Sequence, residues 1–120
     1  MIKLKHIIND VVVDEFVMVE GRFTIGRSQS NSLQLDDAMV SGEHAILRFV
    51  PNEYMPEMFD VTIRDLGSTN GTFVNNTSVQ ELKIRHGDTI RIGNNEFRLF
   101  DEGSAVGTQT EFYVPEDQAE

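Results

Sequence analysis

Four polar side chains in this chain of 120 residues have the chemistry of an oxyanion-binding pocket. Arg27, Ser41, Thr69 and Asn70 each belong to a small polar cluster at the end of an apolar, strand-like run. A guanidinium presents a planar fork of donors that matches phosphate oxygens, while hydroxyl and carboxamide groups add neutral donors. Because the ends of neighbouring strands can converge on one rim, the spacing predicts a binding site built from loops.

The runs that must position these residues alternate between apolar and polar side chains. The clearest is 59–63, where Phe59, Val61 and Ile63 alternate with polar residues, and no window shows a helical period. Asn75-Asn76 stands where a hairpin needs residues that tolerate positive φ. The run 16–19 is short and apolar, as expected of a buried strand. Many short strands separated by turn signals predict an all-β sandwich or barrel.

Several motifs of this chain, in their order and spacing, match those of a known domain family. The segment from about residue 23 to residue 100 resembles the forkhead-associated (FHA) domain, a phosphothreonine-peptide-binding module. The resemblance implies an all-β fold, namely a two-sheet antiparallel β-sandwich with binding loops at one end. The residues that carry it are Gly26-Arg27, Asn31-Ser32-Leu33-Gln34-Leu35, Val40-Ser41-Gly42-Glu43-His44-Ala45, Asp65 through Asn75, and Gly87 through Gly93.

The resemblance also implies a role for each polar side chain. Arg27 is expected to be the principal phosphate ligand, and Ser41 and Thr69 to donate their hydroxyls to phosphate oxygens. Asn70 would hold the peptide backbone on either side of the phosphothreonine. The ordinary alternatives are a solvated Arg at a strand end, a turn or cap Ser, and a plain Asn-Gly turn.

Three further residues are expected to shape the loops rather than touch the phosphate. Gly26 and Gly71 let the backbone turn sharply beside the ligands. His44 could suggest catalysis or charge pairing, but the resemblance implies a structural ring whose hydrogen bonds fix the binding loops. His6, His44 and His86 lack metal-ligand spacing, so neither a metal site nor a cofactor is expected.

One position departs from the family pattern. The family usually has a longer polar or basic residue directly after the Ser of Ser41-x-x-His44, and here that residue is Gly42. A direct donor to the phosphate is then missing unless the Gly42 N–H or a neighbour such as Arg22, Lys83 or Arg85 replaces it. Loss of one charge-assisted hydrogen bond costs about 1.5–3 kcal/mol.

Composition limits the kinds of partner. The formal net charge is −10, so nucleic acid and anionic membranes are not expected as partners. There is no cysteine, which removes disulfides, zinc-thiolate sites and cysteine nucleophiles, and no apolar run reaches membrane-spanning length. The absence of a signal-peptide pattern favours a cytoplasmic protein.

The chain divides into two regions by composition. Residues 1–102 are predicted to form the FHA domain, and residues 103–120 an acidic, flexible C-terminal tail. Either Thr108 or Thr110 could be phosphorylated and occupy the pocket of its own chain or of a second copy. The plainer interpretation is a linker.

The resulting hypothesis is a signalling adaptor that docks onto a protein phosphorylated on threonine by a Ser/Thr kinase. The alternative is a phosphate-independent scaffold that uses the same sandwich. An enzyme is not expected, because no acidic partner for His44 is identifiable and no catalytic residues are assigned.

Overall fold

The computed structural model describes residues 1–101, and all regular secondary structure in this range is β-strand. None of these residues therefore belongs to a helix that could cross a membrane. The strands are β1 Ile2–Ile8, β2 Val11–Met18, β3 Gly21–Gly26, β4 Leu33–Gln34, β5 Ala45–Pro51, β6 Phe59–Asp65, β7 Thr72–Val74, β8 Thr77–Val79, β9 Glu81–Ile84, β10 Thr89–Ile92 and β11 Asn95–Asp101. The predicted tail, 103–120 with Thr108 and Thr110, lies outside the described residues.

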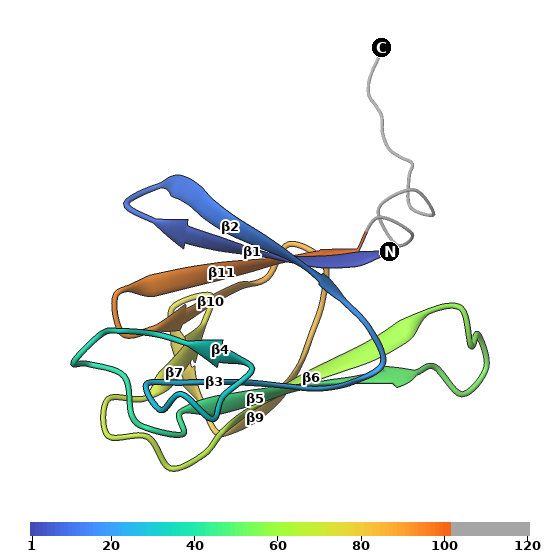
Figure 1. The fold of residues 1–120 in the computed structure, drawn as a ribbon. Helices are drawn as coiled ribbons and strands as arrows, with labels where there is room; N and C mark the ends of the chain where they lie inside the picture. Colours follow the sequence, from blue (N-terminus) through green and yellow to red (C-terminus); the bar gives the residue numbers. More distant parts are fainter. Residues whose placement is uncertain (102–120) are drawn as a thin grey trace.

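Two sheets pack face to face, which confirms the predicted sandwich (Figure 1). One sheet has the strand order β2-β1-β11-β10-β7-β8, and the other has the order β4-β3-β5-β6-β9. Every pair is antiparallel except β3 and β4, which are parallel. This pair departs from a wholly antiparallel sandwich because the loop 27–32 returns the chain to run alongside β3, where the Leu35 N–H donates to the Gly26 carbonyl at 2.9 Å.

The core lies between the sheets and is filled mainly by alternate residues of the inner strands. In β6, for example, Val61 and Ile63 are buried while Arg64 is exposed. Burying such side chains provides most of the stabilising free energy of a sandwich. The largest fully buried apolar side chains are Leu4, Ile25, Leu47, Phe49, Ile63, Ile90, Ile92, Phe97 and Leu99.

The sequence correctly predicts the hairpin turn between β7 and β8. Asn75 and Asn76 both have positive φ, at 49° and 70°, as a two-residue turn of this hand requires. The Asn75 carboxamide also accepts from the Thr89 N–H at 3.0 Å and donates to Asp88 at 3.0 Å. The turn is therefore tied to the neighbouring strand β10.

The prediction of a buried strand at 16–19 holds for only one face of the strand. Residues 16–18 belong to β2, an edge strand that pairs only with β1; Met18 is buried and Phe16 packs against the core, but Val17 is 57% exposed. A register shift between His6 and Ile7 marks an irregularity in this pairing. An edge strand lacks a neighbour on one side and has only one face toward the core, so Val17 stays in solvent even though its sequence is typical of a core.

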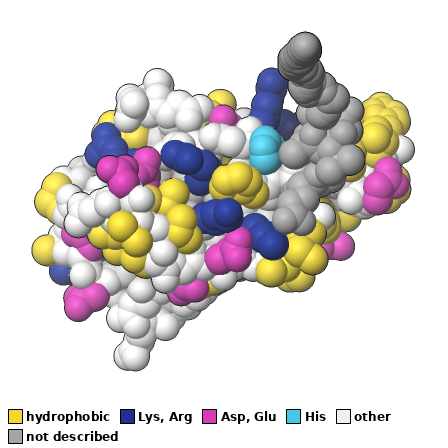
Figure 2. All heavy atoms as spheres, turned by 90° about the horizontal axis from the view of Figure 1, so that it is seen from above, with side chains coloured by type: hydrophobic (Ala, Val, Ile, Leu, Met, Phe, Trp, Pro, Cys, Tyr) yellow, Lys and Arg dark blue, Asp and Glu magenta, His cyan; other side chains and the backbone are white. Residues whose placement is uncertain are grey.

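Basic side chains on the outer face of the six-stranded sheet have partners. Figure 2 shows Lys and Arg side chains on this face with Asp and Glu side chains among them. Lys5 pairs with Glu15 at 4.0 Å and lies 4.3 Å from the centre of the Phe100 ring. Arg91 lies 4.4 Å above the Phe73 ring. Lys5 and Arg91 are thus each held by neighbouring side chains of this face.

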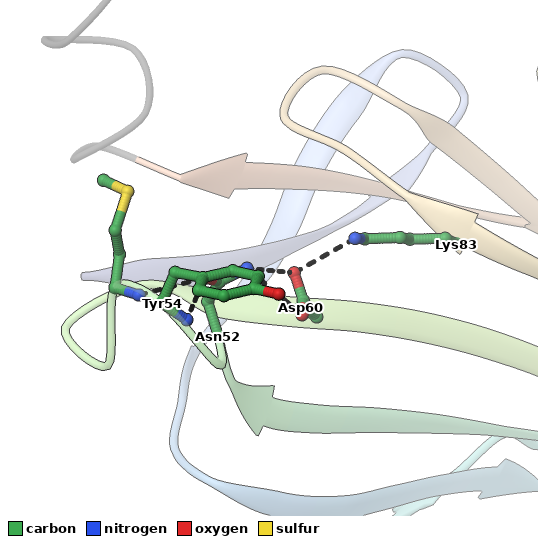
Figure 3. Close-up of polar contacts among 5 residues, drawn as sticks. Asn52, Tyr54, Asp60 and Lys83 are labelled. Carbon is green, nitrogen blue, oxygen red and sulfur yellow. Dashed lines mark hydrogen bonds and ion pairs between the residues drawn. The ribbon is translucent and has the colours of Figure 1, made fainter.

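The end of the β5–β6 hairpin is fixed by Asn52 and Asp60 (Figure 3). The Asn52 oxygen accepts the N–H groups of Tyr54 and Met55, at 2.9 and 3.0 Å, and its amide donates to Asp60 at 3.2 Å. Lys83 pairs with Asp60 at 3.1 Å. The Asn52 hydrogen bond and Lys83 both hold the pKa of Asp60 below its ordinary value.

A polar clamp fastens the segment before β5 to the six-stranded sheet. Asp37 accepts the N–H groups of Met39 and Asn94, each at 2.9 Å, and the Asn95 amide at 3.1 Å. The Asn95 oxygen in turn accepts from His6 Nε2 at 2.9 Å. The Asn94 and Met39 N–H groups hold the pKa of Asp37 below its ordinary value. This clamp positions the segment that leads into Ser41.

We predict that Asp37→Ala lowers the free energy of unfolding by about 1–3 kcal/mol, because three donors lose their acceptor. The matched control is Asp36→Ala, since Asp36 is exposed and has no hydrogen bond to residues within 1–101. The control should change stability by less than about 0.5 kcal/mol. Urea unfolding measures both, and equal losses in the two variants would contradict the clamp.

Candidate functional site

Three loops meet at one end of the sandwich: 27–32 after β3, 35–44 before β5, and 66–71 between β6 and β7 (Figure 1). Their backbones are joined directly. The Arg27 N–H donates to the Ser41 carbonyl at 2.9 Å, and the Leu66 N–H donates to the His44 carbonyl at 2.9 Å. The loops that carry the four predicted ligands therefore form one hydrogen-bonded unit.

Gly26 occupies a position that tolerates no side chain. A Cβ there would lie 2.2 Å from the Gly42 carbonyl oxygen and 2.7 Å from the Asn31 amide nitrogen. A glycine is therefore required where β3 ends, because the loop 35–44 crosses closely over it. Gly42 differs, since a Cβ there would meet nothing within 4 Å.

Asn31 is a structural residue of the site whose role the sequence analysis missed. Its amide donates to the Ser28 carbonyl at 2.8 Å and to the Gly42 carbonyl at 2.7 Å. It thereby closes its own loop and holds the neighbouring one. A polar residue in a turn-rich loop carries no sequence signal for so distant a partner, because the contact depends on the tertiary arrangement.

His44 is fully buried beneath the loops. The Ser41 N–H donates to Nδ1 at 3.1 Å, so this nitrogen carries no proton and Nε2 donates to the Gly71 carbonyl at 2.9 Å. The ring therefore bridges the loops 35–44 and 66–71. Both ring nitrogens are occupied by backbone groups, so neither is directed at a ligand.

Asp65 holds the loop 66–71 from inside the protein. Its carboxylate accepts the N–H groups of Gly67 and Ser68, each at 3.0 Å, together with the hydroxyls of Ser68 at 2.6 Å and Thr72 at 2.7 Å. The Ser68 hydroxyl also accepts the Gly71 N–H at 2.9 Å. An Asp followed by Gly, Ser and Thr is a sequence signal for such a loop, because short polar side chains bond the backbone two or three residues on.

The predicted ligands Ser41, Thr69 and Asn70 lie together across two of these loops. The Thr69 N–H donates to the Ser41 hydroxyl oxygen at 3.0 Å, which leaves the hydroxyl proton of Ser41 available as a donor. The Asn70 amide donates to the Met39 carbonyl at 2.9 Å. One amide proton and the side-chain oxygen of Asn70 remain for a ligand.

Arg27 has a fixed backbone and an unengaged side chain. Its N–H and carbonyl are bonded to Ser41 and to the Gln34 amide, the latter at 3.2 Å. Its guanidinium is exposed and makes no ion pair with any residue of 1–101. The guanidinium donors of Arg27 are thus exposed to solvent next to the loop that carries Ser41, where they are available to bind an oxyanion.

The arrangement is suited to anion binding through neutral and positive donors. The donors available are the Arg27 guanidinium and the hydroxyls of Ser41 and Thr69. In the part of the chain that the structure describes, no group of three His, Asp or Glu side chains could hold a metal ion. Of the neighbours considered as substitutes at Gly42, Lys83 is paired with Asp60 at 3.1 Å.

We predict that Asp65 makes stability depend on pH. Burial raises the pKa of Asp65, but the hydrogen bonds from Ser68, Thr72 and Gly67 outweigh it, so this pKa lies below its ordinary value of 3.8. A carboxyl of this kind stabilises the fold above its ordinary pKa, and the gain is lost as the pH falls through the lowered value. The stability difference between the wild type and Asp65→Asn should therefore shrink as the pH falls from 6 toward 3.

Denaturant unfolding at several pH values measures this difference, and Asp36→Asn serves as the exposed control. A difference between the wild type and Asp65→Asn that stays constant down to pH 3 would show that the carboxylate charge does not hold the loop.

Comparisons with known proteins agree with this arrangement. The family model for the FHA domain matches residues 23–93. FhaA of Mycobacterium tuberculosis is 40% identical over 77 residues, which are 64% of this chain and 13% of that protein. The glycogen accumulation regulator GarA of the same organism is 34% identical over 84 residues, which are 70% of this chain and 46% of that protein. The chain thus spans less than half the length of these curated relatives.

Solved structures show the same fold. One comes from a study of phosphothreonine-dependent FHA domain interactions; it is 33% identical, covers 84% of this chain and 96% of its own, and has a TM-score of 0.71. Another is the FhaA FHA domain in complex with the intracellular domain of a second protein, with 33% identity, coverage of 82% and 99%, and a TM-score of 0.69. Because the family model, the relatives and the fold agree, this chain belongs to the FHA domain family.

Proposed function

We propose that this chain is a phosphothreonine-dependent protein-interaction module. The single observation that carries the proposal is the rim of donors without partners. The Arg27 guanidinium, the Ser41 hydroxyl proton and the Thr69 hydroxyl all stand on loops whose backbones are already bonded. A ligand would therefore find a preformed site and would not have to order the loops first.

The phosphate would be bound through charge and hydrogen bonds together. A phosphothreonine carries close to two negative charges at neutral pH, and Arg27 can pair with two of its oxygens. Ser41 and Thr69 would each donate a hydroxyl to an oxygen, while Asn70 would bond the peptide backbone. His44, Gly26 and Gly71 would act through the loops and would not contact the ligand.

The relatives support this function. A solved FHA domain was studied for its phosphothreonine-dependent interactions. EmbR of Mycobacterium tuberculosis, which is 27% identical with a TM-score of 0.68, was solved in complex with a phosphopeptide. We infer that the partner here is a protein phosphorylated by a Ser/Thr kinase and that the chain works as a signalling adaptor, without chemistry of its own. The FhaA complex with an intracellular domain supports a cytoplasmic site of action.

The proposed affinity depends on Gly42. Nothing stands in the place of the family's usual polar or basic side chain, so the phosphate has one donor fewer. A micromolar site corresponds to about −8 kcal/mol, and loss of about 1.5–3 kcal/mol makes it at least tenfold weaker. The alternative hypothesis of a phosphate-independent scaffold is motivated by this same residue, Gly42. The relatives named above favour phosphate-dependent binding.

Isothermal titration with a degenerate phosphothreonine peptide pool tests the proposal, and the unphosphorylated pool is its control. Heat from the phosphorylated pool alone would support it. No heat from either pool would contradict the proposed function and would favour the phosphate-independent scaffold.

We predict that Arg27→Ala weakens phosphopeptide binding by about 2–5 kcal/mol, because the phosphate loses its ion partner at the site. Arg98→Ala is the matched control, since Arg98 is an exposed arginine on the six-stranded sheet. Titrations of both variants with one peptide should differ by at least tenfold in Kd. Indistinguishable curves for Arg27→Ala and the wild type would remove Arg27 from the site.

We also predict that Gly42→Arg strengthens phosphopeptide binding about tenfold by restoring a charge-assisted hydrogen bond. The open space around Gly42 accommodates a side chain without displacing the loops. Gly42→Gln, of similar reach but uncharged, should gain less. If Gly42→Arg binds phosphopeptide no better than the wild type while its thermal stability is unchanged, position 42 does not face the phosphate.

A further inference from the structure

The outer face of the five-stranded sheet has a shallow concavity of about 330 Å³. Three arginines line it: Arg22 from β3, Arg48 from β5 and Arg64 from β6. From the sequence, a role was expected only for Arg22, as a substitute donor at Gly42. The family motifs used above include none of the three.

The strand register brings the three arginines together. Arg22 stands directly opposite Arg48 in the antiparallel β3–β5 pair, and Arg64 stands opposite Ile46, two residues before Arg48 on the same face. Like charges directly opposite each other on antiparallel strands destabilise a sheet. The pairing therefore costs stability in the free protein, and a bound anion would relieve that cost.

No carboxylate of residues 1–101 forms an ion pair with Arg22, Arg48 or Arg64. The other arginines of residues 1–101 also lack a carboxylate ion pair, so what distinguishes these three is their placement together on one face of the sheet. Lys83, on the same sheet, is neutralised by Asp60 at 3.1 Å (Figure 3), and Lys5 on the opposite face pairs with Glu15. Glu43 also lines the concavity, and Glu81 of β9 stands opposite Arg64, so three arginines meet two glutamates and one positive charge remains in surplus.

A packing role alone does not account for three charges. Ile46 points to the outer face yet is only 7% exposed, so neighbouring side chains cover it. Aliphatic stems of arginines can provide such cover. A Met or Gln side chain would cover Ile46 equally well without placing two guanidinium groups opposite each other.

The concavity adjoins the candidate phosphopeptide site. Ser30 and Asn31 of the loop 27–32 and Leu66 at the start of the loop 66–71 form part of its lining. These are the loops that carry Arg27 and Thr69. An extended peptide advances about 3.3 Å per residue, so residues near a phosphothreonine held at Arg27 can extend toward the three arginines.

We propose that Arg22, Arg48 and Arg64 form a second anion-binding subsite that takes anionic side chains flanking the phosphothreonine in the same peptide. The inference rests on the proposed function and specifies its ligand class: a phosphothreonine peptide that also carries glutamates, aspartates or a second phosphate. Guanidinium groups bind carboxylate and phosphate through the same bidentate geometry, so either source of charge fits.

Four phosphothreonine peptides of equal length test the subsite. One has neutral flanks, one has glutamates after the phosphothreonine, one has glutamates before it, and one carries a second phosphothreonine. The proteins are the wild type, the double variant Arg48→Gln/Arg64→Gln, and Arg91→Gln/Arg98→Gln on the other sheet as the control for a generic loss of two positive charges. Glutamine keeps part of the stem over Ile46 and removes the charge.

We expect anionic flanks on at least one side to tighten binding to the wild type about five- to tenfold at low salt. This gain should disappear in Arg48→Gln/Arg64→Gln and persist in Arg91→Gln/Arg98→Gln. The neutral-flank peptide should bind all three proteins equally, since its phosphate contacts remain. The two glutamate peptides and the doubly phosphorylated peptide show which side and which anion the subsite prefers.

The inference is overturned if anionic flanks give no gain, or if the double variant keeps that gain. Failure of every phosphorylated peptide to bind would instead contradict the proposed function. In that case, NMR is used to follow the arginine Nε–Hε signals of the wild type during addition of an unphosphorylated glutamate-rich peptide. Movement of the Arg22, Arg48 and Arg64 signals would support an anion site independent of phosphothreonine, and unchanged signals would overturn it.

Discussion

The candidate site depends on two buried polar side chains that hold the loops from beneath. Backbone N–H and carbonyl groups that leave water must find partners, and a loop has no ladder to supply them. Here His44 serves the loops 35–44 and 66–71 with its two ring nitrogens, while Asp65 accepts four hydrogen bonds within and beside the loop 66–71. The shape of the rim therefore follows from the interior of the sandwich.

The groups that hold the loops in place differ from the groups that are available to bind a ligand. The backbone of Arg27 is bonded, whereas its guanidinium is not, and the Ser41 hydroxyl accepts from Thr69 while keeping its own proton. Positive charge is local in a chain of net charge −10, at Arg27 and in the concavity of Arg22, Arg48 and Arg64. Screening limits distant charges to about 8 Å at physiological salt, so a local cluster can still capture an anion.

Local chemistry made much of the fold predictable from the sequence. Strand β6 follows strict alternation, and the Asn75-Asn76 turn follows from residues that tolerate positive φ. The apolar run at 16–19 was only partly predictive: Met18 is buried, but composition does not show that Val17 and Val19 face solvent at the edge of a sheet. The role of Asn31 and the Asp37–Asn95–His6 clamp were not predicted for a related reason: the hydrogen-bond partners are far away in the sequence. The motifs located the rim and indicated a structural role for His44, whereas the hydrogen bonds of Asn31 and of the clamp are seen only in the tertiary structure.

The central claim is that this rim receives a phosphothreonine. Amide NMR of the labelled protein during titration with a phosphothreonine peptide pool tests it most directly, with the unphosphorylated pool measured in parallel. The account predicts that shifts specific to the phosphorylated pool concentrate at Arg27, Ser41, Thr69 and Asn70 and the loops that carry them. Shifts that are the same for both pools, or that fall on the opposite end of the sandwich around 52–58, would contradict it.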